Sequence, residues 1–310
     1  MSSRGAIVAQ APSAAALAPR SLGRSDARIQ AVNPRIRLLA VDIDGTLLDS
    51  RFQISPANQA ALRRASQAGV EIVLVTGRRH SFALPIARQL EVPLAIISSN
   101  GAITRPLEGD LFHRHLLPRP AALALCAHMK EFRSALVLTF EREDRGALVL
   151  ESFDGFTGAI SRWMQMNREF IECVQPIEQS LVTDPIQAMF CGSVARMQAA
   201  LAHLRSGAVA SDVHALRTEY PRRDLAIVDV LAPGCSKGAA LERWAHHRGY
   251  GRHQVMAIGD NYNDVEMLEF AGLPVIMGNA SQELQQNGWA RTASNDESGV
   301  AAAVEQFIDC

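Results

Sequence analysis

Two aspartates in the segment LLAVDIDGTLLDS, residues 38–50, have the spacing of a reactive pair. Asp42 and Asp44 are two residues apart, so on a strand their side chains point to the same side. The apolar run before them is typical of a parallel strand that is buried on both faces. Two carboxylates there repel each other unless a cation or a proton offsets their charge. An Asp-Gly turn is the simpler interpretation, but the second acid favours a functional site.

Three further segments place polar residues where strands or helices are expected to end or begin. Thr76 follows the apolar run VEIVLV, and Lys237 stands at a predicted helix start. The run GDNYND contributes Asp260, Asn263 and Asp264. Singly, each has a structural interpretation, such as a helix cap or a solvated surface residue. Together they offer a nucleophile, a proton donor, a hydroxyl, a cation and further carboxylates, which phosphoryl transfer with Mg²⁺ requires.

Lysine is rare in this chain, which makes the position of Lys237 informative. The sequence contains two lysines, Lys130 and Lys237, against 29 arginines. A compact ammonium group differs in shape and hydration from a guanidinium fork. A lysine kept beside a glycine at a helix start therefore favours a specific role for its charge.

The elements that must position these residues alternate between strands and helices. We expect buried strands over 38–42, 70–76, 94–102, 254–260 and 274–278. A first helix is expected from Ser55-Pro56 to Gly69, and a second one, after the strand 70–76, ends at about residue 90. Further helices are expected from 236 onward, near 263–272 and from 299. This alternation predicts a parallel sheet with right-handed crossovers. Open sheets of this kind bind ligands at the carboxyl ends of their strands.

The pattern changes between the third and fourth of these strands. Strands are expected over 135–141, 147–151, 186–192 and 225–232, with helices over 119–132 and 194–205. Strands so close in sequence favour antiparallel pairing. We therefore predict a parallel-sheet core domain from 37–103 and 232–310, and an inserted α+β cap domain from 104–231. Residues 1–36 form a separate N-terminal extension, either disordered or a targeting segment.

The four motifs DIDGT, TGR, SKG and GDNYND, in this order, resemble those of the haloacid dehalogenase-like phosphatases. The large insert between TGR and SKG, preceded by SSNGA, is similar to the Cof-type sugar-phosphatase branch. The resemblance covers residues 36–310. It implies an α/β fold, with a Rossmann-like parallel-sheet core and an α/β cap over the active site, and a phosphoaspartyl mechanism.

The resemblance also implies roles for single residues. Asp42 is the nucleophile, and Asp44 is the general acid and base. Mg²⁺ is held by the carboxylates of Asp42 and Asp260 and by the backbone carbonyl of Asp44. Asp264 is assigned to the same metal site, where it orients the ligands and the catalytic Lys237. Substrate contacts are expected from a set of motif residues: Thr76, Gly77, Arg78, Asn100, Lys237 and Asn263.

Other functions are less consistent with the sequence. A dinucleotide-binding oxidoreductase lacks G-x-G-x-x-G after the first strand, and GCSKG does not match a P-loop. A haloalkanoate dehalogenase would not need Asp44. A phosphomutase, or a non-catalytic protein that binds a phosphorylated metabolite, remains an alternative. His113 and His115 could ligate a metal but are expected to be solvated on a short cap strand, and Cys235 is expected to be a packing residue.

Bulk composition excludes several partners. The formal charge is −1 and the pI about 6.8, so neither nucleic acid nor an anionic membrane is an expected partner. Five scattered cysteines without C-x-x-C suit a reducing compartment. We expect a cytoplasmic enzyme that acts on a small phosphorylated metabolite, or a plastid or other organellar one if the Arg- and Ser-rich extension is a transit peptide. No feature of the sequence indicates an oligomeric state.

Overall fold

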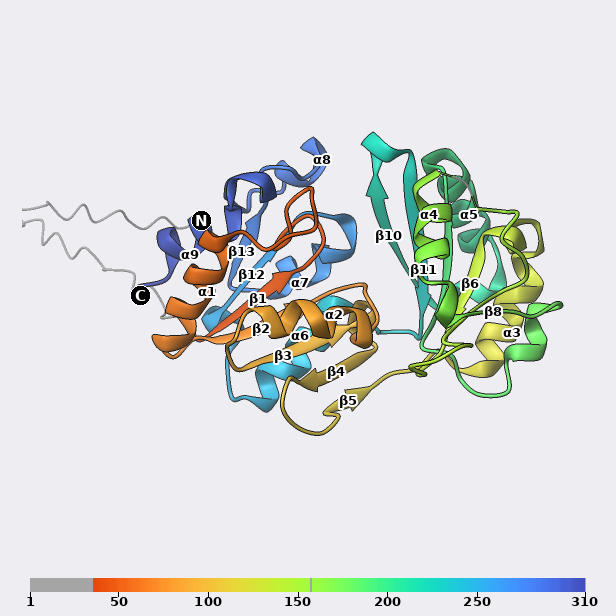
Figure 1. The fold of residues 1–310 in the computed structure, drawn as a ribbon, viewed down its shortest axis with the longest axis horizontal. Coiled ribbons are helices and arrows are strands. Elements are labelled where there is room, and N and C mark those ends of the chain that lie inside the picture. Colours follow the sequence, from red (N-terminus) through yellow and green to blue (C-terminus); the bar gives the residue numbers. More distant parts are fainter. Residues whose placement is uncertain (1–35, 157, 310) are drawn as a thin grey trace, which may run out of the picture. The chain divides into compact units, whose positions relative to one another are not determined.

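A computed structural model describes residues 36–156 and 158–309. The extension expected over residues 1–36 lies outside the described residues, except for Ile36. The first sheet has eight strands in the order β14-β13-β12-β1-β2-β3-β4-β5 (Figure 1). Their bounds are β1 Leu38–Asp42, β2 Glu71–Val75, β3 Leu94–Ser98, β4 Ile103–Pro106, β5 His113–Arg114, β12 Val255–Gly259, β13 Leu273–Ile276 and β14 Ala290–Arg291.

The strands from β14 to β3 are parallel, as expected. In the register of the sheet, Val41 of β1 lies beside Ile258 of β12, and Asp42 lies beside Val75 of β2. The carboxyl ends of these central strands therefore meet at one edge, and the residues that follow each strand are brought together there.

Alternating residues of the central strands face two different helix layers. One buried cluster joins Leu39, Val41 and Leu74 to helices α1 (Pro56–Gln67), α2 (His80–Gln89) and α9 (Gly299–Phe307). The other joins Leu38 and Ala40 to α6 (Lys237–His247) and α7 (Val265–Phe270); the short α8 (Gln282–Gln285) contributes Leu284. Covering both faces is what lets these strands be continuously apolar, so the predicted α/β core is confirmed.

Helix α1 begins where the sequence predicts it. Ser55 caps the helix, because its side chain accepts a hydrogen bond from the backbone N–H of Asn58, and Pro56 occupies the first turn. Proline is favoured there because the N–H it lacks would have no helical partner.

The second sheet has six strands in the order β10-β11-β9-β6-β7-β8. Their bounds are β6 Leu136–Thr139, β7 Leu148–Leu150, β8 Ile171–Cys173, β9 Gln187–Gly192, β10 His214–Tyr220 and β11 Leu225–Leu231. All pairs are antiparallel except β7 with β8. Helices α3 (Arg119–His128) and α5 (Val194–Ser206) pack on one face, and α4 (Gly158–Met166) packs on the other. This mixed sheet matches the predicted α+β insert.

Strands β4 and β5 bear on where the insert begins. Strand β4 was not predicted and β5 was expected to be a short cap strand, but both add antiparallel strands to the edge of the first sheet beside β3. The chain reverses direction through Gly101, whose φ of 103° favours glycine, and so pairs with the strand it has just left. His113 therefore lies on a strand of the core sheet, not of the cap. We propose that the cap begins after Arg114 and not at 104.

Other elements also differ from expectation. Strands β8, β10 and β14 were not predicted, and the helix expected over 119–132 ends at His128 and is followed by a 3₁₀ segment, Lys130–Ala135. Within residues 36–156 and 158–309, no helix is both long and apolar enough to cross a membrane.

Candidate active site

Three buried carboxylates converge at the carboxyl edge of the first sheet. Asp42 ends β1, Asp260 follows β12, and Asp264 ends the 3₁₀ turn Tyr262–Asp264 that leads into α7. One oxygen from each lies within 4.8 Å of the others. The exposed fractions of the three residues are 8% or less. Oxygen ligands at this spacing, out of bulk water, suit a hard divalent cation.

Lys237 is the single ammonium group that faces these acids in the described chain. Its Nζ lies 2.6 Å from Oδ1 of Asp42 and 2.5 Å from Oδ1 of Asp264, and the side chain is 1% exposed. Ser236 caps helix α6 by accepting a hydrogen bond from the N–H of Ala239. The helix start therefore fixes the direction in which Lys237 enters the cluster.

The single positive charge of Lys237 does not balance the charges of three acids. Burial, and then the charge of Asp264, raises the pKa of Asp42 to about 7, although Lys237 opposes this. Burial and the charge of Asp42 likewise raise the pKa of Asp260 well above its ordinary value. Burial alone would lower the pKa of Lys237, but Asp264 and Asp42 raise it. A divalent cation would relieve this excess of negative charge, so the donor set fits a metal site.

The backbone around the cluster is shaped to accept Asp260. Gly45 has a φ of 85°, and a Cβ placed on it would lie 2.4 Å from Oδ2 of Asp260, so another residue would clash. Thr46 donates from Oγ1 to Oδ1 of Asp260 at 3.1 Å. Asp264 accepts the N–H groups of Asp260 and Asn261 on Oδ2, both at 3.0 Å, which holds the loop closed.

Asp44 is oriented by an arginine that the sequence assigned to substrate binding. Arg78 donates to both oxygens of Asp44, from Nε at 2.7 Å and from Nη2 at 2.6 Å. Such a bidentate pair fixes the plane of the carboxylate. Thr76 is fully buried, and its Oγ1 accepts from the N–H of Arg78 at 3.1 Å. Thr76 therefore does not cap α2, which begins at His80.

The remaining predicted contacts are also gathered here. Asn263 donates from Nδ2 to Oδ1 of Asn100 at 3.0 Å. Gly77 packs against the same amide, since a Cβ on it would lie 3.2 Å from that oxygen. The structure thus brings together all ten residues singled out from the sequence; their individual roles stay predictions.

Tyr220 is a cap residue at the site that sequence reasoning missed. It ends β10, next to Glu219, which exchanges two hydrogen bonds with Asn261: N to Oδ1 at 3.1 Å and Nδ2 to O at 3.0 Å. Burial, and then the charges of Asp44 and Asp260, raises the pKa of Tyr220 well above 10, so its phenol stays protonated. No local signal in the sequence marks this residue, because its position depends on pairing between segments 42 residues apart.

Asp229 is a second residue that sequence reasoning missed. It lies on β11, is 5% exposed, and accepts from Nδ2 of Asn100 and from Nε2 of Gln187, both at 2.9 Å. Burial raises its pKa to about 7, against the opposing effects of these hydrogen bonds and of Lys237. A lone acid inside the apolar run LAIVDVLA was the available signal, because a buried charge requires partners.

A pH dependence of stability follows from Asp229. Its pKa is higher in the folded chain than the unfolded value of 3.8, so the folded state holds a proton that the unfolded state has lost. The resulting stabilisation is present below about pH 4 and is lost as the pH rises to about 7. In EDTA, the free energy of unfolding of the natural chain minus that of Asp229→Asn should therefore fall between these pH values. Denaturant titrations at pH 5 and 8 measure it; a difference that rises or stays constant contradicts the prediction.

His113 and His115 do not join the carboxylates. In the described residues, the one cluster of acids, histidines or cysteines with metal-ligand spacing is that of Asp42. Burial, and then the nearby Arg243, lowers the pKa of both histidines. Cys235 is buried in an apolar cluster beside Ile103, as expected of a packing residue.

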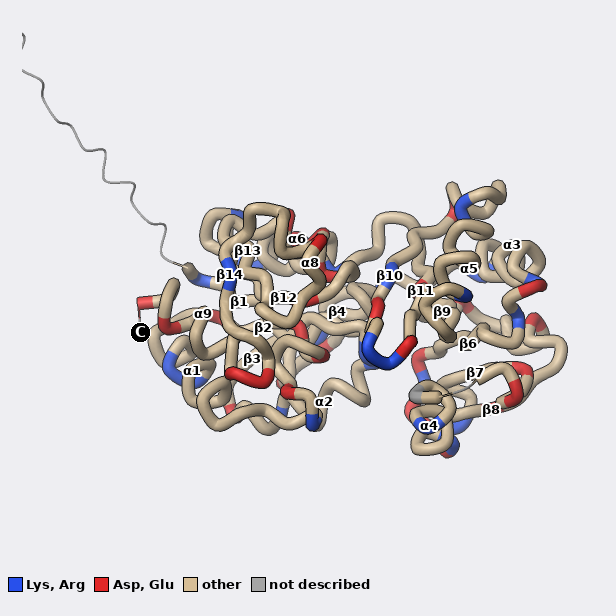
Figure 2. Tube along the Cα trace, turned by 90° about the horizontal axis from the view of Figure 1, so that it is seen from above, with Lys and Arg blue, Asp and Glu red and all other residues tan. Residues whose placement is uncertain are grey.

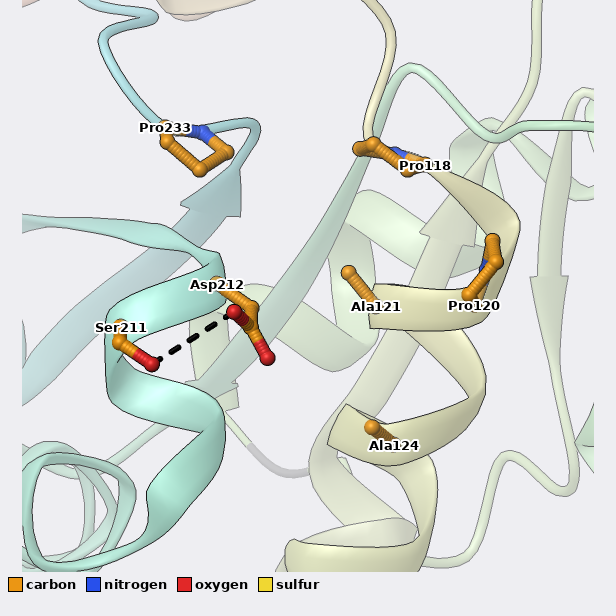
Figure 3. Close-up of a pocket in the computed structure, with 7 residues that line it drawn as sticks. All are labelled: Pro118, Pro120, Ala121, Ala124, Ser211, Asp212 and Pro233. Atoms are coloured by element: carbon orange, nitrogen blue, oxygen red, sulfur yellow. Dashed lines mark hydrogen bonds between the residues drawn. The ribbon is translucent and has the colours of Figure 1, made fainter.

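A hollow of about 370 Å³ lies away from the carboxylates, between the start of α3 and the 3₁₀ segment Ala208–Asp212 (Figure 3). Its lining is mostly proline and alanine: Pro118, Pro120, Ala121, Ala124, Ser211, Asp212 and Pro233. It offers one carboxylate and no cation, so it does not suit a phosphate ester.

Comparison with known proteins places the chain in a family. The family model for haloacid dehalogenase-like hydrolases matches residues 39–304. The chain therefore belongs to the haloacid dehalogenase-like hydrolases, which confirms the predicted family and the hydrolase class.

Relatives and a solved structure agree with this assignment. The HMP-PP phosphatase of Cronobacter sakazakii is 31% identical, over 80% of this chain and 86% of its own. The pyridoxal phosphate phosphatase YbhA of Escherichia coli is 29% identical, over 88% and 97%. The crystal structure of a haloacid dehalogenase-like hydrolase from Bacteroides thetaiotaomicron matches with a TM-score of 0.72 and 26% identity, over 88% of this chain and all of that one.

Proposed function

We propose that the chain is a Mg²⁺-dependent phosphatase that hydrolyses a small phosphorylated metabolite through a phosphoaspartyl intermediate on Asp42. The main support is a buried contact, in which Nζ of Lys237 lies 2.6 Å from Oδ1 of Asp42. A second acid, Asp44, lies two residues further along the chain and is held by Arg78. The two relatives above are named as phosphatases of small phosphorylated compounds, which supports the substrate class.

In the first half-reaction, the free oxygen of Asp42 attacks the phosphorus atom. A bond forms from Oδ2 to phosphorus, and the bond from phosphorus to the ester oxygen breaks. Lys237 holds the other oxygen of Asp42 and so directs the reactive oxygen outward. Asp44 gives its proton to the leaving ester oxygen. Because Arg78 engages both oxygens of Asp44, at least one of these hydrogen bonds must first be exchanged, and the substrate's phosphoryl oxygens are suitable acceptors for Arg78.

In the second half-reaction, Asp44 takes a proton from a water molecule. The resulting hydroxide attacks the phosphorus of the aspartyl phosphate, and the bond to Asp42 breaks, which releases phosphate and restores the carboxylate. Thr76 and the second N–H of Asn263 donate to phosphoryl oxygens. The carboxylates of Asp42 and Asp260 and the backbone carbonyl of Asp44 would hold Mg²⁺, with Asp264 orienting these ligands and Lys237, and the ion would supply charge neutralisation for the phosphoryl group.

The turn between β10 and β11 is the part of the cap that we expect to contact the substrate. Figure 2 shows this turn as a basic segment with acidic residues on either side, and its arginines are Arg222 and Arg223. Arg223 lies over the ring of Phe52, 5.4 Å from its centre, in the loop after β1. We expect this turn, together with Tyr220, to lie over the alcohol part of the bound ester, to exclude water there and to contribute to the choice of substrate.

The decisive experiment is phosphate release from a panel of small phosphorylated metabolites and p-nitrophenyl phosphate. Activity should vanish in EDTA and return with Mg²⁺ but not with Ca²⁺, because calcium takes more ligands at longer distances. Full activity in chelator would contradict the metal assignment, and absence of phosphate release from every ester with Mg²⁺ would contradict the function. We expect this activity in the cytoplasm, which the free cysteines favour.

A further inference from the structure

The segment Ser99–Gly101, which follows β3, has an unusual backbone. Its three consecutive residues have positive φ angles of 48°, 52° and 103°. Only the last is glycine, and the other two adopt a left-handed conformation that is unfavourable for residues with a Cβ. Strain of this kind persists only where surrounding contacts offset it. Contacts with neighbouring segments must therefore hold Ser99–Gly101 in place.

Backbone contacts tie the segment to two parts of the active site. The N–H of Ser99 donates to the carbonyl of Arg78 at 2.8 Å, and the N–H of Asn100 donates to the carbonyl of Thr76 at 3.0 Å. A Cβ on Gly101 would lie 2.2 Å from the carbonyl oxygen of Ser236, so only glycine fits beside the start of α6. The strained turn thus contacts both the segment that carries Thr76 and the segment that carries Lys237.

The side chain of Asn100 extends these contacts into the cap. A chain of three hydrogen bonds runs from the cap sheet to the active site. Nε2 of Gln187 donates to Asp229 at 2.9 Å, and Nδ2 of Asn100 donates to the other oxygen of Asp229 at 2.9 Å. Nδ2 of Asn263 then donates to Oδ1 of Asn100 at 3.0 Å. All four residues are buried, with exposed fractions of 7% or less.

The residue at the cap end, Asp229, sets which group donates and which accepts in each of these hydrogen bonds. At pH 8, above its pKa of about 7, Asp229 is ionised and only accepts hydrogen bonds, so it requires the NH₂ group of Asn100 to face it. The carbonyl oxygen of Asn100 must then face Asn263, which must present its own NH₂ group. The second N–H of Asn263 is left to donate to a phosphoryl oxygen. With Asn100 reversed, Asn263 would present an oxygen to the phosphate and repel it.

We propose that Asp229 and Gln187, both on cap strands, are positioning residues that act through Asn100 to aim the amide of Asn263 at the phosphoryl group. This inference rests on the proposed function. It replaces the predicted substrate contact of Asn100 with an internal role, because both ends of that amide are engaged within the protein. It also makes the geometry of the phosphate site depend on how the cap is attached.

The first test is Asp229→Asn, assayed at pH 8 with Mg²⁺. An amide at position 229 no longer dictates the direction of Asn100, so the donor to the phosphoryl group is lost in part. We expect KM for p-nitrophenyl phosphate and the inhibition constant of inorganic phosphate to rise together by about tenfold, the value of one hydrogen bond to a charged group, with little change in kcat. A merely structural role would instead lower apparent kcat and leave both constants unchanged.

The second test restores the direction of the hydrogen bonds that link Gln187, position 229, position 100 and Asn263. In the double variant Asn100→Asp, Asp229→Asn, the amide at 229 accepts from Gln187 and donates to the carboxylate at 100, which still accepts from Asn263. Aspartate tolerates the left-handed backbone at position 100. We expect both constants to return to within about threefold of the natural enzyme.

Controls separate the possible outcomes. Thr139→Val removes a buried hydroxyl from the neighbouring strand β6, outside the chain of hydrogen bonds, and should leave both constants unchanged. A double variant no better than Asp229→Asn, or an Asp229→Asn enzyme with natural constants, would overturn the inference while leaving the phosphatase function intact. If the natural chain releases no phosphate from any ester, the proposed function itself fails.

Discussion

Asp42→Asn is expected to abolish turnover of every phosphate ester, with a loss of roughly 10⁴-fold or more. An amide oxygen cannot form the aspartyl phosphate, and no other carboxylate replaces it, because Asp264 is occupied by Lys237 and by two backbone N–H groups. The protein should still fold, since Lys237 keeps Asp264 as a partner. Initial rates with p-nitrophenyl phosphate, on protein with a natural circular dichroism spectrum, measure the loss.

Asp44→Asn should behave differently, because its role is proton transfer. With a poor leaving group both half-reactions suffer, and the rate should fall roughly a hundredfold or more. The p-nitrophenolate group needs little protonation, so attack by Asp42 proceeds while hydrolysis of the intermediate becomes limiting. We expect a burst of p-nitrophenol approaching one equivalent per site, followed by slow turnover.

The phosphorylated protein should be detectable in the same experiment. Acid quench during the slow phase should leave phosphate on the chain, and hydroxylamine should release it as expected of an acyl phosphate. The amide at position 44 retains one acceptor for Arg78, which keeps the site near its natural shape. Equal, burst-free losses in both variants would show that Asp44 is not the general acid and base.

Asp42 and Asp260 could be predicted from the sequence because each follows an apolar run of strand length. Two such runs in a parallel sheet end at the same edge, so their trailing acids face the same side of the molecule. That they are neighbours follows from the pairing of β1 with β12, which the sequence alone does not give. Lys237 needed more support, since a helix-start lysine has many other uses. Its meaning came from its rarity and from the order of the motifs.

The positions of Tyr220 and Gln187 could not be predicted, because they depend on pairing between distant segments. Tyr220 reaches the acids only because β10 pairs with β11 and its end bonds to Asn261. The edge strands β4 and β5 also depend on pairing with another part of the sheet. They are short, and their sequences carry no alternation of polar and apolar residues that would distinguish them from a loop. Such elements are stabilised by the sheet they join and not by local preference.

Lys237→Met is expected to combine a large loss of activity with a loss of stability. It leaves Asp42 and Asp264 buried without their ammonium partner, and breaking a buried ion pair by removing one member typically costs about 3 to 5 kcal/mol. The pKa of Asp42, already raised to about 7 by burial and by Asp264, should rise further, so its nucleophilic form becomes scarce near neutral pH. Turnover should fall at least a hundredfold.

The sign of the accompanying pH effect distinguishes this mechanism from general damage. Because the folded-state pKa of Asp42 lies above its unfolded value of 3.8, the stability linked to its proton is present at low pH and lost as the pH rises. In EDTA, the stability deficit of Lys237→Met should therefore be large at pH 8 and smaller at pH 5, and added Mg²⁺ should reduce it at pH 8. Lys130→Met is the matched control, since it removes the other lysine, which is exposed and forms no ion pair in the described chain. A deficit independent of both pH and Mg²⁺ would show that the ammonium of Lys237 acts by packing and not by holding the charge of the three acids.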